Sequence, residues 1–126
     1  MKRIFITFAL LLICLSAAGA ELWYIGNTAD SFTRRIEKID ALMMKDDFTK
    51  ASKLCGEVSS DWDKTASFLD TLLIHDYIDS IGINLSQMKT HIDSCCPDMY
   101  FAGSAGAKKG LASIKGSEYP KFDNIF

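Results

Sequence analysis

The sequence predicts an all-α protein in which one N-terminal transmembrane helix precedes a small antiparallel bundle of three to four helices. The first observation behind this prediction is an uncharged apolar run close to the N-terminus. The second is that apolar residues in the remainder recur in steps of three and four, the period of an α-helix, and nowhere alternate as in a strand. About a hundred residues remain for the folded part, enough for one small domain.

The N-terminal segment has features of both a membrane anchor and a cleavable signal sequence. The basic start, residues 1–3, precedes an uncharged run over 4–20, whose length lies between that of a signal-peptide core and that of a membrane span. Counting over 4–25 gives a run with a single acid, long enough to cross a bilayer core of roughly 30 Å. Trp23 and Tyr24 are typical of a membrane interface, where an apolar ring with a polar edge is favoured.

These features divide the chain into four predicted segments. In chain order they are a cytoplasmic basic end, a transmembrane anchor or uncleaved signal sequence, an extracytoplasmic helical domain and an extended C-terminal tail, over residues 1–3, 4–25, 26–116 and 117–126. The basic start places the N-terminus in the cytoplasm by the positive-inside rule. The expected localisation is therefore the cell membrane, with a single pass and the domain outside.

Residues 18–20, Ala-Gly-Ala, support the alternative that the chain is secreted. They have the small-x-small form that a signal peptidase recognises, and cleavage after Ala20 would release the remainder. Retention of the segment in the membrane is favoured for two reasons. Trp23 and Tyr24 are typical of a membrane interface, and Ile25 both ends the span and begins the first apolar stripe of the domain. One helix could then run from bilayer to domain, with Gly26 and Asn27 as the place where the join is loosest.

The first apolar stripe of the domain predicts one α-helix. Its members are Ile25, Ala29, Phe32, Ile36, Ile39 and Met43. Asn27, Thr28 or Asp30 can cap the start of this helix by accepting hydrogen bonds from free backbone N–H groups. Asp46 and Asp47 then interrupt the apolar pattern and supply the cap of the next helix.

A second stripe predicts the next helix, and Trp62 is expected to anchor it in the core. The stripe comprises Phe48, Ala51, Cys55, Val58 and Trp62, and drifts onward through Ala66, Leu69 and Leu73. No glycine or proline marks the end of this helix. The phase of the pattern changes near residues 74–76, where we predict a tight turn.

A third stripe predicts a helix that Pro97 stops, because proline lacks an N–H and its ring clashes with the preceding turn. The stripe comprises His75, Ile78, Ile81, Leu85, Met88, Ile92 and Cys95. Pro97 can in turn open a fourth helix. That helix has the weakest pattern, since three glycines each cost about 1 kcal/mol relative to alanine. The residues it can bury are Tyr100, Phe101, Leu111 and Ile114, and Gly116 ends it.

The charge of the domain argues against nucleic-acid binding. The formal net charge of the whole chain is −2 and becomes −4 without Lys2 and Arg3, and between Cys55 and Met88 a single base, Lys64, stands among six acids. Nucleic-acid binders need a basic surface that displaces counterions from phosphates. We therefore expect no nucleic-acid partner and a solvated acidic face. The acids are Glu57, Asp61, Asp63, Asp70, Asp76 and Asp79.

The four cysteines do not make a disulfide framework. Cys14 lies in the apolar run, and lipidation is excluded there because the preceding residue, Ile13, is not small. The rest of the chain keeps an odd number, Cys55, Cys95 and Cys96. One bridge from Cys55 to either of the other two stays open, and free thiols are the favoured interpretation.

The alternative function is a secreted or extracytoplasmic metal-binding or redox module that uses His91, Cys95, Cys96 and Cys55. His91, Cys95 and Cys96 could present two or three ligands to Zn²⁺ from a helix, with Cys55, His75 or an acid completing the four that a closed site needs. No CxxC or HxxxH spacing supports this. The favoured interpretation places Cys95 in the core stripe and His91 on its edge, so we expect no metal and no other cofactor.

No combination of residues predicts an enzyme. A nucleophilic Cys95 or Cys96 with His91 as base would lack a third group to orient the base and donors for the developing oxyanion. The acids lack the glycine-containing loop of a calcium site, and no phosphate-binding loop follows a strand. We expect a protein that is not an enzyme and has no identifiable small-molecule substrate.

Several marks of the chain, in their order, are similar to those of a known family. They are the basic start with its single apolar span, DDFTKA at 46–51, Trp62, His75, IDSIGINLSQMKTHI at 78–92, and the ending Asn124-Ile125-Phe126. This order resembles the small membrane-anchored proteins of Firmicutes known as domain of unknown function 4363. The resemblance covers essentially the whole chain. It implies a transmembrane start and a largely helical fold, and it implies no catalytic residues.

The fourth segment departs from the family. A helix rich in Leu and Glu is expected where this chain has FAGSAGAKKGLASIKG, which weakens the expectation of a closed bundle.

The expected function is a non-catalytic protein-binding or scaffolding module of the cell envelope, with another envelope or membrane protein as partner. The candidate interaction or structural residues are Trp62, His75, Asn124, Ile125 and Phe126. Ile125 and Phe126 are expected to dock onto the domain, because an apolar end left in water gains nothing.

Overall fold

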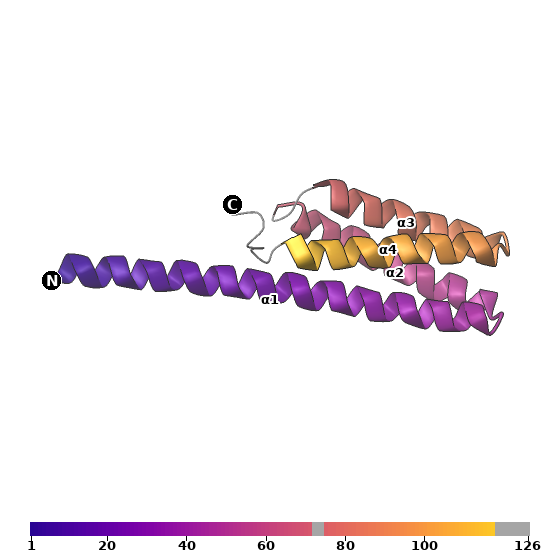
Figure 1. Ribbon diagram of the computed structural model, residues 1–126, viewed down its shortest axis with the longest axis horizontal. Helices are drawn as coiled ribbons and strands as arrows, with labels where there is room; N and C mark the ends of the chain where they lie inside the picture. The colour runs from indigo at the N-terminus through magenta and orange to yellow at the C-terminus, as the bar shows by residue number, and fades with distance from the viewer. Residues whose placement is uncertain (72–74, 118–126) are drawn as a thin grey trace.

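The computed structural model describes residues 1–71 and 75–117 and is built from four α-helices. They are α1 (Lys2–Met44), α2 (Phe48–Leu69), α3 (His75–Asp93) and α4 (Pro97–Ser117) (Figure 1). The described residues contain no strand. The predicted all-α fold, with a long apolar N-terminal helix followed by a helical bundle, is confirmed.

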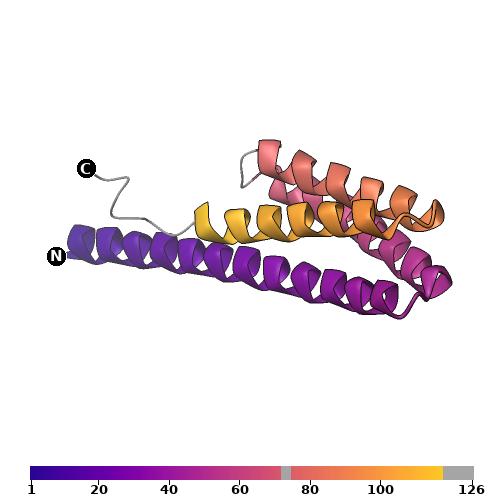
Figure 2. The ribbon, with the colours of Figure 1, turned by 45° about the vertical axis from the view of Figure 1, so that its right-hand side comes forward.

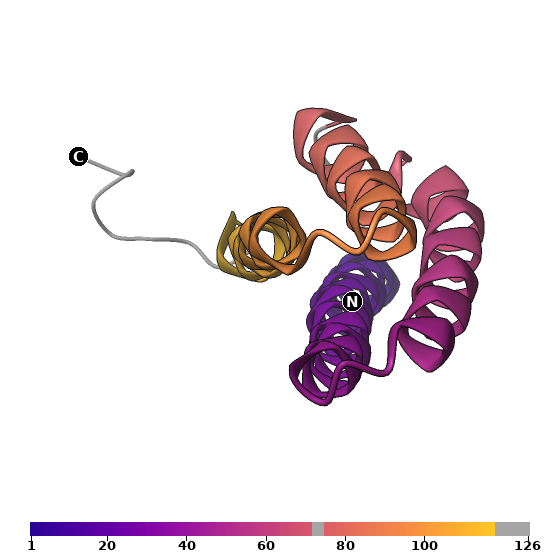
Figure 3. The ribbon, with the colours of Figure 1, turned by 90° about the vertical axis from the view of Figure 1, so that its right-hand side faces the viewer.

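The four helices form a ring in which each one packs against its neighbours in the chain, and α4 closes the ring on α1 (Figure 3). Short connections make successive helices antiparallel, as in an up-down-up-down bundle. The apolar stripe of each helix faces the centre of the ring, where burial of apolar surface drives folding. The bundle is therefore closed, although the glycine-rich composition of the fourth segment had weakened that expectation.

The first helix continues without interruption from Lys2 to Met44, and its N-terminal half projects alone beyond the bundle (Figure 2). No separate cap forms at Asn27, Thr28 or Asp30, so that prediction is wrong. The large apolar side chains of the projecting half are 51–73% exposed, whereas burial begins at Ile25. One helix therefore has two environments, an unpartnered apolar half and a half that belongs to the bundle.

The predicted stripes are buried along most of their length. All six stripe residues of α1 are buried, and so are the five central members of the α3 stripe. In α2 the buried members are Ala51, Cys55, Val58, Trp62 and Leu69, with Phe48 and Ala66 packed partly buried against them. Leu73, the last predicted member, lies outside the described residues. The predicted tight turn at residues 74–76 falls partly outside them, and its described part, His75 and Asp76, is the first turn of α3.

The prediction is wrong at the two ends of the third stripe. His75 and Cys95 are exposed, because α3 begins at His75 and ends at Asp93. Two residues after that end, Cys95 has a φ of 52°, and the chain has left the helix before Pro97. Pro97 opens α4 as predicted, in the first helical position, where its missing N–H costs nothing.

The turns that follow α1 and α3 have the same construction. After α1, Asp46 has a φ of 57°, its N–H donates to the Met43 carbonyl, and the Asp47 N–H donates to the Leu42 carbonyl. After α3, the Cys95 N–H donates to Ile92 and the Cys96 N–H to His91. Both patterns are Schellman motifs, in which a left-handed residue ends the helix.

The second turn residue of the first motif also starts the next helix. The Asp47 carboxylate accepts a hydrogen bond from the Lys50 N–H, which confirms the predicted cap of α2.

We expect glycine at either left-handed position to stabilise the bundle. A left-handed conformation costs a residue with a Cβ about 1–2 kcal/mol, and glycine avoids most of this. Asp46→Gly and Cys95→Gly should each raise the free energy of unfolding by about 1 kcal/mol, because both side chains are exposed. Thermal unfolding of the full chain in detergent, followed by circular dichroism, measures this. Cys95→Val is the control and should destabilise; equal effects of Gly and Val would contradict the explanation.

Glycines on α4 allow this helix to approach α3 closely. A Cβ on Gly103 would lie 3.2 Å from the Met88 Cγ, and one on Gly110 would lie 2.7 Å from the Ile81 Cγ1. The composition that predicted a weak helix is thus the composition that permits this contact. On the same helix Tyr100, Leu111 and Ile114 are buried as predicted, together with Ala107, whereas Phe101 is exposed, contrary to prediction.

We expect Gly110→Ala to destabilise the bundle by about 1–2 kcal/mol, even though alanine is the better helix former, because overpacking outweighs the gain in propensity. The contact falls on the Ile81 Cγ1, close to the backbone, which cannot move away as a flexible side-chain end could.

Gly26→Ala is the matched control. Nothing lies within 4 Å of a Cβ at that position, so this variant should be neutral or stabilising in the same thermal unfolding assay. A stabilising Gly110→Ala would contradict the proposed close packing of α3 and α4.

Candidate functional site

Trp62 is a core residue, as predicted. Its side chain is 1% exposed, its Nε1–H donates to the Ile78 carbonyl of α3 at 3.3 Å, and its ring meets the Phe32 ring of α1 edge to face at 5.1 Å. A Cβ on Gly82 would lie 3.6 Å from the indole. Trp62 therefore joins three helices, and its polar atom has the partner that a buried indole needs.

His75 stands at the start of α3 with its side chain 71% exposed. Its Nδ1 lies 3.1 Å from the Oδ1 of Asp70, the C-cap residue that follows the end of α2. The pair joins the end of one helix to the start of the next. The remaining predicted residues, Asn124, Ile125 and Phe126, lie outside the described residues, and so does their predicted docking.

The residues of the metal or redox alternative are not brought together. The Cys55 Sγ lies 3.7 Å from the Leu85 carbonyl, whereas Cys95 and Cys96 follow the end of α3 at Asp93, about 12 Å further along the helix at helical rise. A disulfide needs Cα atoms within about 4.4–6.8 Å. Cys55 therefore cannot bridge to Cys95 or Cys96 in this fold. Among residues 1–71 and 75–117, no group of three His, Cys, Asp or Glu side chains is placed to hold a metal ion.

Burial raises the pKa of the Cys55 thiol to about 11, with the nearby Lys89 ammonium opposing the shift. We expect Cys55 to resist alkylation by iodoacetamide at pH 8 in the folded chain, because the thiolate is the reactive form. The exposed Cys95 should react, and denaturant should release Cys55. Mass spectrometry of the labelled peptides measures each site.

The same raised pKa predicts a loss of stability at high pH. The stabilisation from the protonated, buried thiol is complete below the unfolded pKa of about 8.5 and is lost as pH rises toward 11. Cys55→Ala should remove this part of the pH dependence of unfolding. Rapid labelling of Cys55 in the folded chain would contradict its burial.

Asp40 joins α1 to α4 through three side chains that the sequence analysis did not single out. Its Oδ1 accepts hydrogen bonds from the Tyr100 hydroxyl and the Ser104 hydroxyl, each at 2.6 Å, and its Oδ2 lies 2.8 Å from the Lys108 ammonium. Burial, and then the hydrogen bond to Asp40, raise the pKa of Tyr100 well above its usual range. The available signal was the spacing of four between Tyr100, Ser104 and Lys108, which puts three donors on one face of a helix.

Ion pairs join α1 to both of its neighbours at the rims of the bundle. Arg35 of α1 meets Asp61 of α2 at 2.7 Å, and Lys115 of α4 meets Asp30 of α1 at 3.0 Å. Both pairs are partly exposed, so each contributes little to stability and mainly sets the register of the helices.

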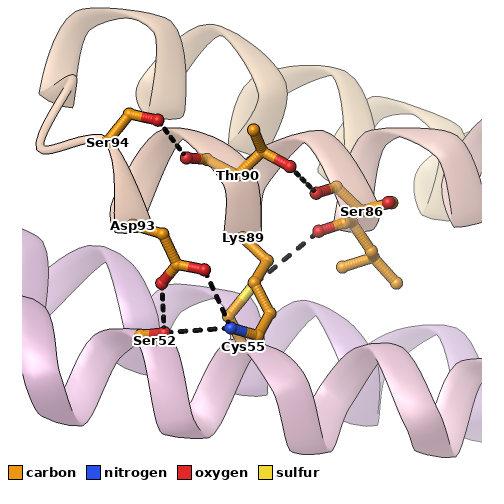
Figure 4. A network of polar contacts seen from close by, with 8 residues as sticks. Ser52, Cys55, Ser86, Lys89, Thr90, Asp93 and Ser94 are labelled. Carbon is orange, nitrogen blue, oxygen red and sulfur yellow. Dashed lines mark hydrogen bonds and ion pairs between the residues drawn. The ribbon is translucent and has the colours of Figure 1, made fainter.

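A polar network ties α2 to α3 (Figure 4). The Ser52 hydroxyl donates to Asp93 at 2.5 Å, and the Lys89 ammonium reaches both Ser52 and Asp93. The hydrogen bond from Ser52, followed by that from Lys89, holds the pKa of Asp93 below its usual value. Asp93 is exposed, and the network is a connection between helices.

The outer seam between α2 and α3 contains a shallow groove with an apolar lining and an acidic rim. Its lining residues are Trp62, Asp63, Ala66, Ile78, Asp79, Gly82, Ile83 and Ser86. Ile83 is 58% exposed, unlike the stripe residues Ile81 and Leu85 that flank it. Asp63 and Asp79 contribute the charge, and they belong to the predicted acidic face.

The comparisons with known proteins give one match. A family model described as Domain of unknown function (DUF4363) matches residues 21–125. No curated protein and no solved structure matches the chain.

Proposed function

The chain belongs to the DUF4363 family, and from this membership together with the two environments of α1 we propose that it is a single-pass membrane protein with a non-catalytic, protein-binding bundle outside the cytoplasm. The N-terminal basic residues remain in the cytoplasm, residues 4–25 span the bilayer, and the bundle binds another protein of the envelope.

The exposed apolar half of α1 is the observation that supports a membrane anchor. α1 is long and apolar enough to cross a membrane, and its most apolar stretch, near the N-terminus, is not buried in the structure. An exposed apolar helix of this length is unfavourable in water and favourable in lipid, where its backbone groups are also satisfied. The same helix enters the bundle without a break, so the anchor is continuous with the bundle.

The α2–α3 groove is the surface that supports protein binding. It combines an exposed aliphatic side chain, Ile83, with the carboxylates of Asp63 and Asp79. An apolar centre with a charged rim is the usual anatomy of an interface. The complementary partner is a helix or extended segment that carries apolar and basic side chains.

Labelling of Cys95 in intact cells tests the orientation of the bundle. A membrane-impermeant maleimide should label the chain through Cys95, because this residue is exposed whereas Cys55 is buried. The control that replaces both Cys95 and Cys96 by serine should lose the label. Labelling only after the cells are permeabilised would overturn the proposed topology.

The mature N-terminus distinguishes anchoring from secretion. Every core residue follows Ala20, so cleavage there would leave the core of the bundle complete. We expect a chain that begins at Met1, sediments with membranes and resists carbonate extraction. A chain in the medium that begins at Glu21 would overturn the anchor and support the secreted alternative.

Photo-crosslinking tests the binding surface. A photoreactive residue at Ile83 should give one discrete adduct with an envelope protein in living cells. The control position is Met99, which is similarly exposed, at 53%, but lies at the start of α4, away from the groove. Equal adducts at both positions, or none at Ile83, would overturn the proposed interface.

A further inference from the structure

We propose that the end of the bundle from which α1 emerges rests on the bilayer surface, through an aromatic patch that reaches the lipid headgroups. The patch comprises Tyr24 of α1 and Phe68 of α2, whose rings are in contact, and Trp23, the neighbour of Tyr24 on the side of α1 that faces α4. The proposal depends on the membrane anchor proposed above, and it adds a second contact between the bundle and the membrane, made by α2.

The three rings are exposed at one end of the bundle. Tyr24 and Phe68 meet edge to face with their ring centroids 5.4 Å apart, although Phe68 is 53% exposed and Trp23 more so. Tyr24 and Phe68 also line an open, mostly apolar hollow together with Ala20 and Glu21. Ala20 belongs to the projecting half of α1, so the hollow joins the surface of the anchor to the end of α2.

The rise of α1 sets the depth of this patch. At about 1.5 Å per residue, the twenty steps from Ile4 to Tyr24 cover roughly 30 Å, the thickness of a bilayer core. With Ile4 at the inner edge of the hydrocarbon, Tyr24 lies at the outer edge. Phe68 then lies at the same depth, because its ring contacts that of Tyr24.

The chemistry of the patch fits a headgroup region rather than water. Trp and Tyr are enriched at membrane interfaces, and Phe is among the apolar side chains that interfacial helices bury at the boundary of headgroups and acyl chains. Among residues 1–71 and 75–117, the charged groups around the patch are Glu21, Asp70, His75 and, on α4, Lys115, which is paired with Asp30. They do not add up to a basic surface, so the expected contact does not require anionic lipid.

A contact on α2 would restrict the bundle in a way that the anchor cannot. A single helix leaves the bundle free to rotate about the anchor axis and to tilt. Burying Phe68 beside Tyr24 in the headgroups would fix the side of the bundle that faces the membrane. It would also hold the α2–α3 groove at a constant height and leave it open to a partner.

Tryptophan quenching in vesicles tests the contact. The full-length chain with Trp23→Phe keeps only Trp62, which is buried, as its background fluorophore. Phe68→Trp in this parent places a reporter on the patch. Met99→Trp is the matched control, because Met99 has the same 53% exposure and belongs to the first turn of α4, which starts at the end of the bundle opposite to that from which α1 emerges (Figure 1). Each chain is reconstituted in phosphatidylcholine vesicles that carry a spin label near the headgroup.

We expect the label to reduce the fluorescence of the Phe68→Trp chain and to leave that of the Met99→Trp chain at the level without the label. Thr71→Trp provides a second reporter on an exposed residue just after α2, for the case that position 68 perturbs folding. It too should be quenched.

Flotation of the vesicles separates the two proposals. Chains that do not float with the vesicles would overturn the anchor, and with it this proposal. Chains that float while the reporters at 68 and 71 are no more quenched than the one at 99 would overturn the aromatic contact alone. Quenching only in vesicles that contain anionic lipid would overturn the headgroup chemistry proposed for the patch.

Discussion

Replacing Trp62 with alanine is expected to lower the free energy of unfolding by about 3–5 kcal/mol, the range for removal of a buried aromatic side chain. The indole is 1% exposed and packs against the Phe32 ring at 5.1 Å, so its loss leaves a cavity among three helices. The change also removes the hydrogen bond to the Ile78 carbonyl. Urea unfolding of the full chain in detergent, followed by circular dichroism, measures the effect.

Phe68→Ala is the matched control on the same helix. Phe68 is half exposed, so its side chain is already largely in contact with solvent or detergent. Its replacement by alanine should therefore lower the free energy of unfolding by about 1 kcal/mol or less in the same assay. Trp62→Phe should lie between the two, since it keeps a ring against Phe32 but loses the donated hydrogen bond, worth about 1 kcal/mol. Equal costs for the alanine variants at positions 62 and 68 would contradict the role of Trp62 as the core anchor.

Replacing Asp40 with alanine is expected to cost about 3 kcal/mol, because one carboxylate satisfies three donors on α4. Hydrogen bonds to charged groups contribute about 1.5–3 kcal/mol, and an unsatisfied buried donor costs about 1–3 kcal/mol. Tyr100 and Ser104 are buried and would be left without their acceptor, whereas Lys108 is partly exposed and can turn to water. The same urea unfolding assay measures the loss.

Asp63→Ala is the control for Asp40. Asp63 is an exposed carboxylate on α2, and its removal should change the free energy of unfolding by no more than about 0.5 kcal/mol. The double variant Asp40→Ala, Tyr100→Phe should lose less than the sum of the two single variants, since the unsatisfied hydroxyl is then absent. Additive losses would show that Asp40 and Tyr100 do not act as a pair.

The candidate site was predictable only in part. The burial of Trp62 followed from its place in a stripe, because a large aromatic ring at a core-facing position has no other favourable location. The Asp40 cluster was missed, because its partners lie about sixty residues further along the chain and the sequence does not say which helices meet. The α2–α3 groove and the contact between Tyr24 and Phe68 were missed for the same reason.

The helices themselves follow from local chemistry. Three features depend only on neighbouring residues: apolar side chains spaced three and four apart, the cap at Asp47 and the proline that begins α4. These features predict α2, α3 and the bundle part of α1 without any knowledge of packing. The apolar N-terminal run was equally evident, since hydropathy needs no partner.

Contacts between helices account for what this local chemistry did not predict. α1 runs unbroken through Gly26 into the bundle half against which α2 and α4 pack, and the glycines of α4 permit its close approach to α3. Cys95 leaves the core because the α3–α4 turn needs a left-handed residue there, whatever the period suggests. Helical period is a property of one segment, whereas the end of a stripe depends on where the chain must turn to meet its neighbour.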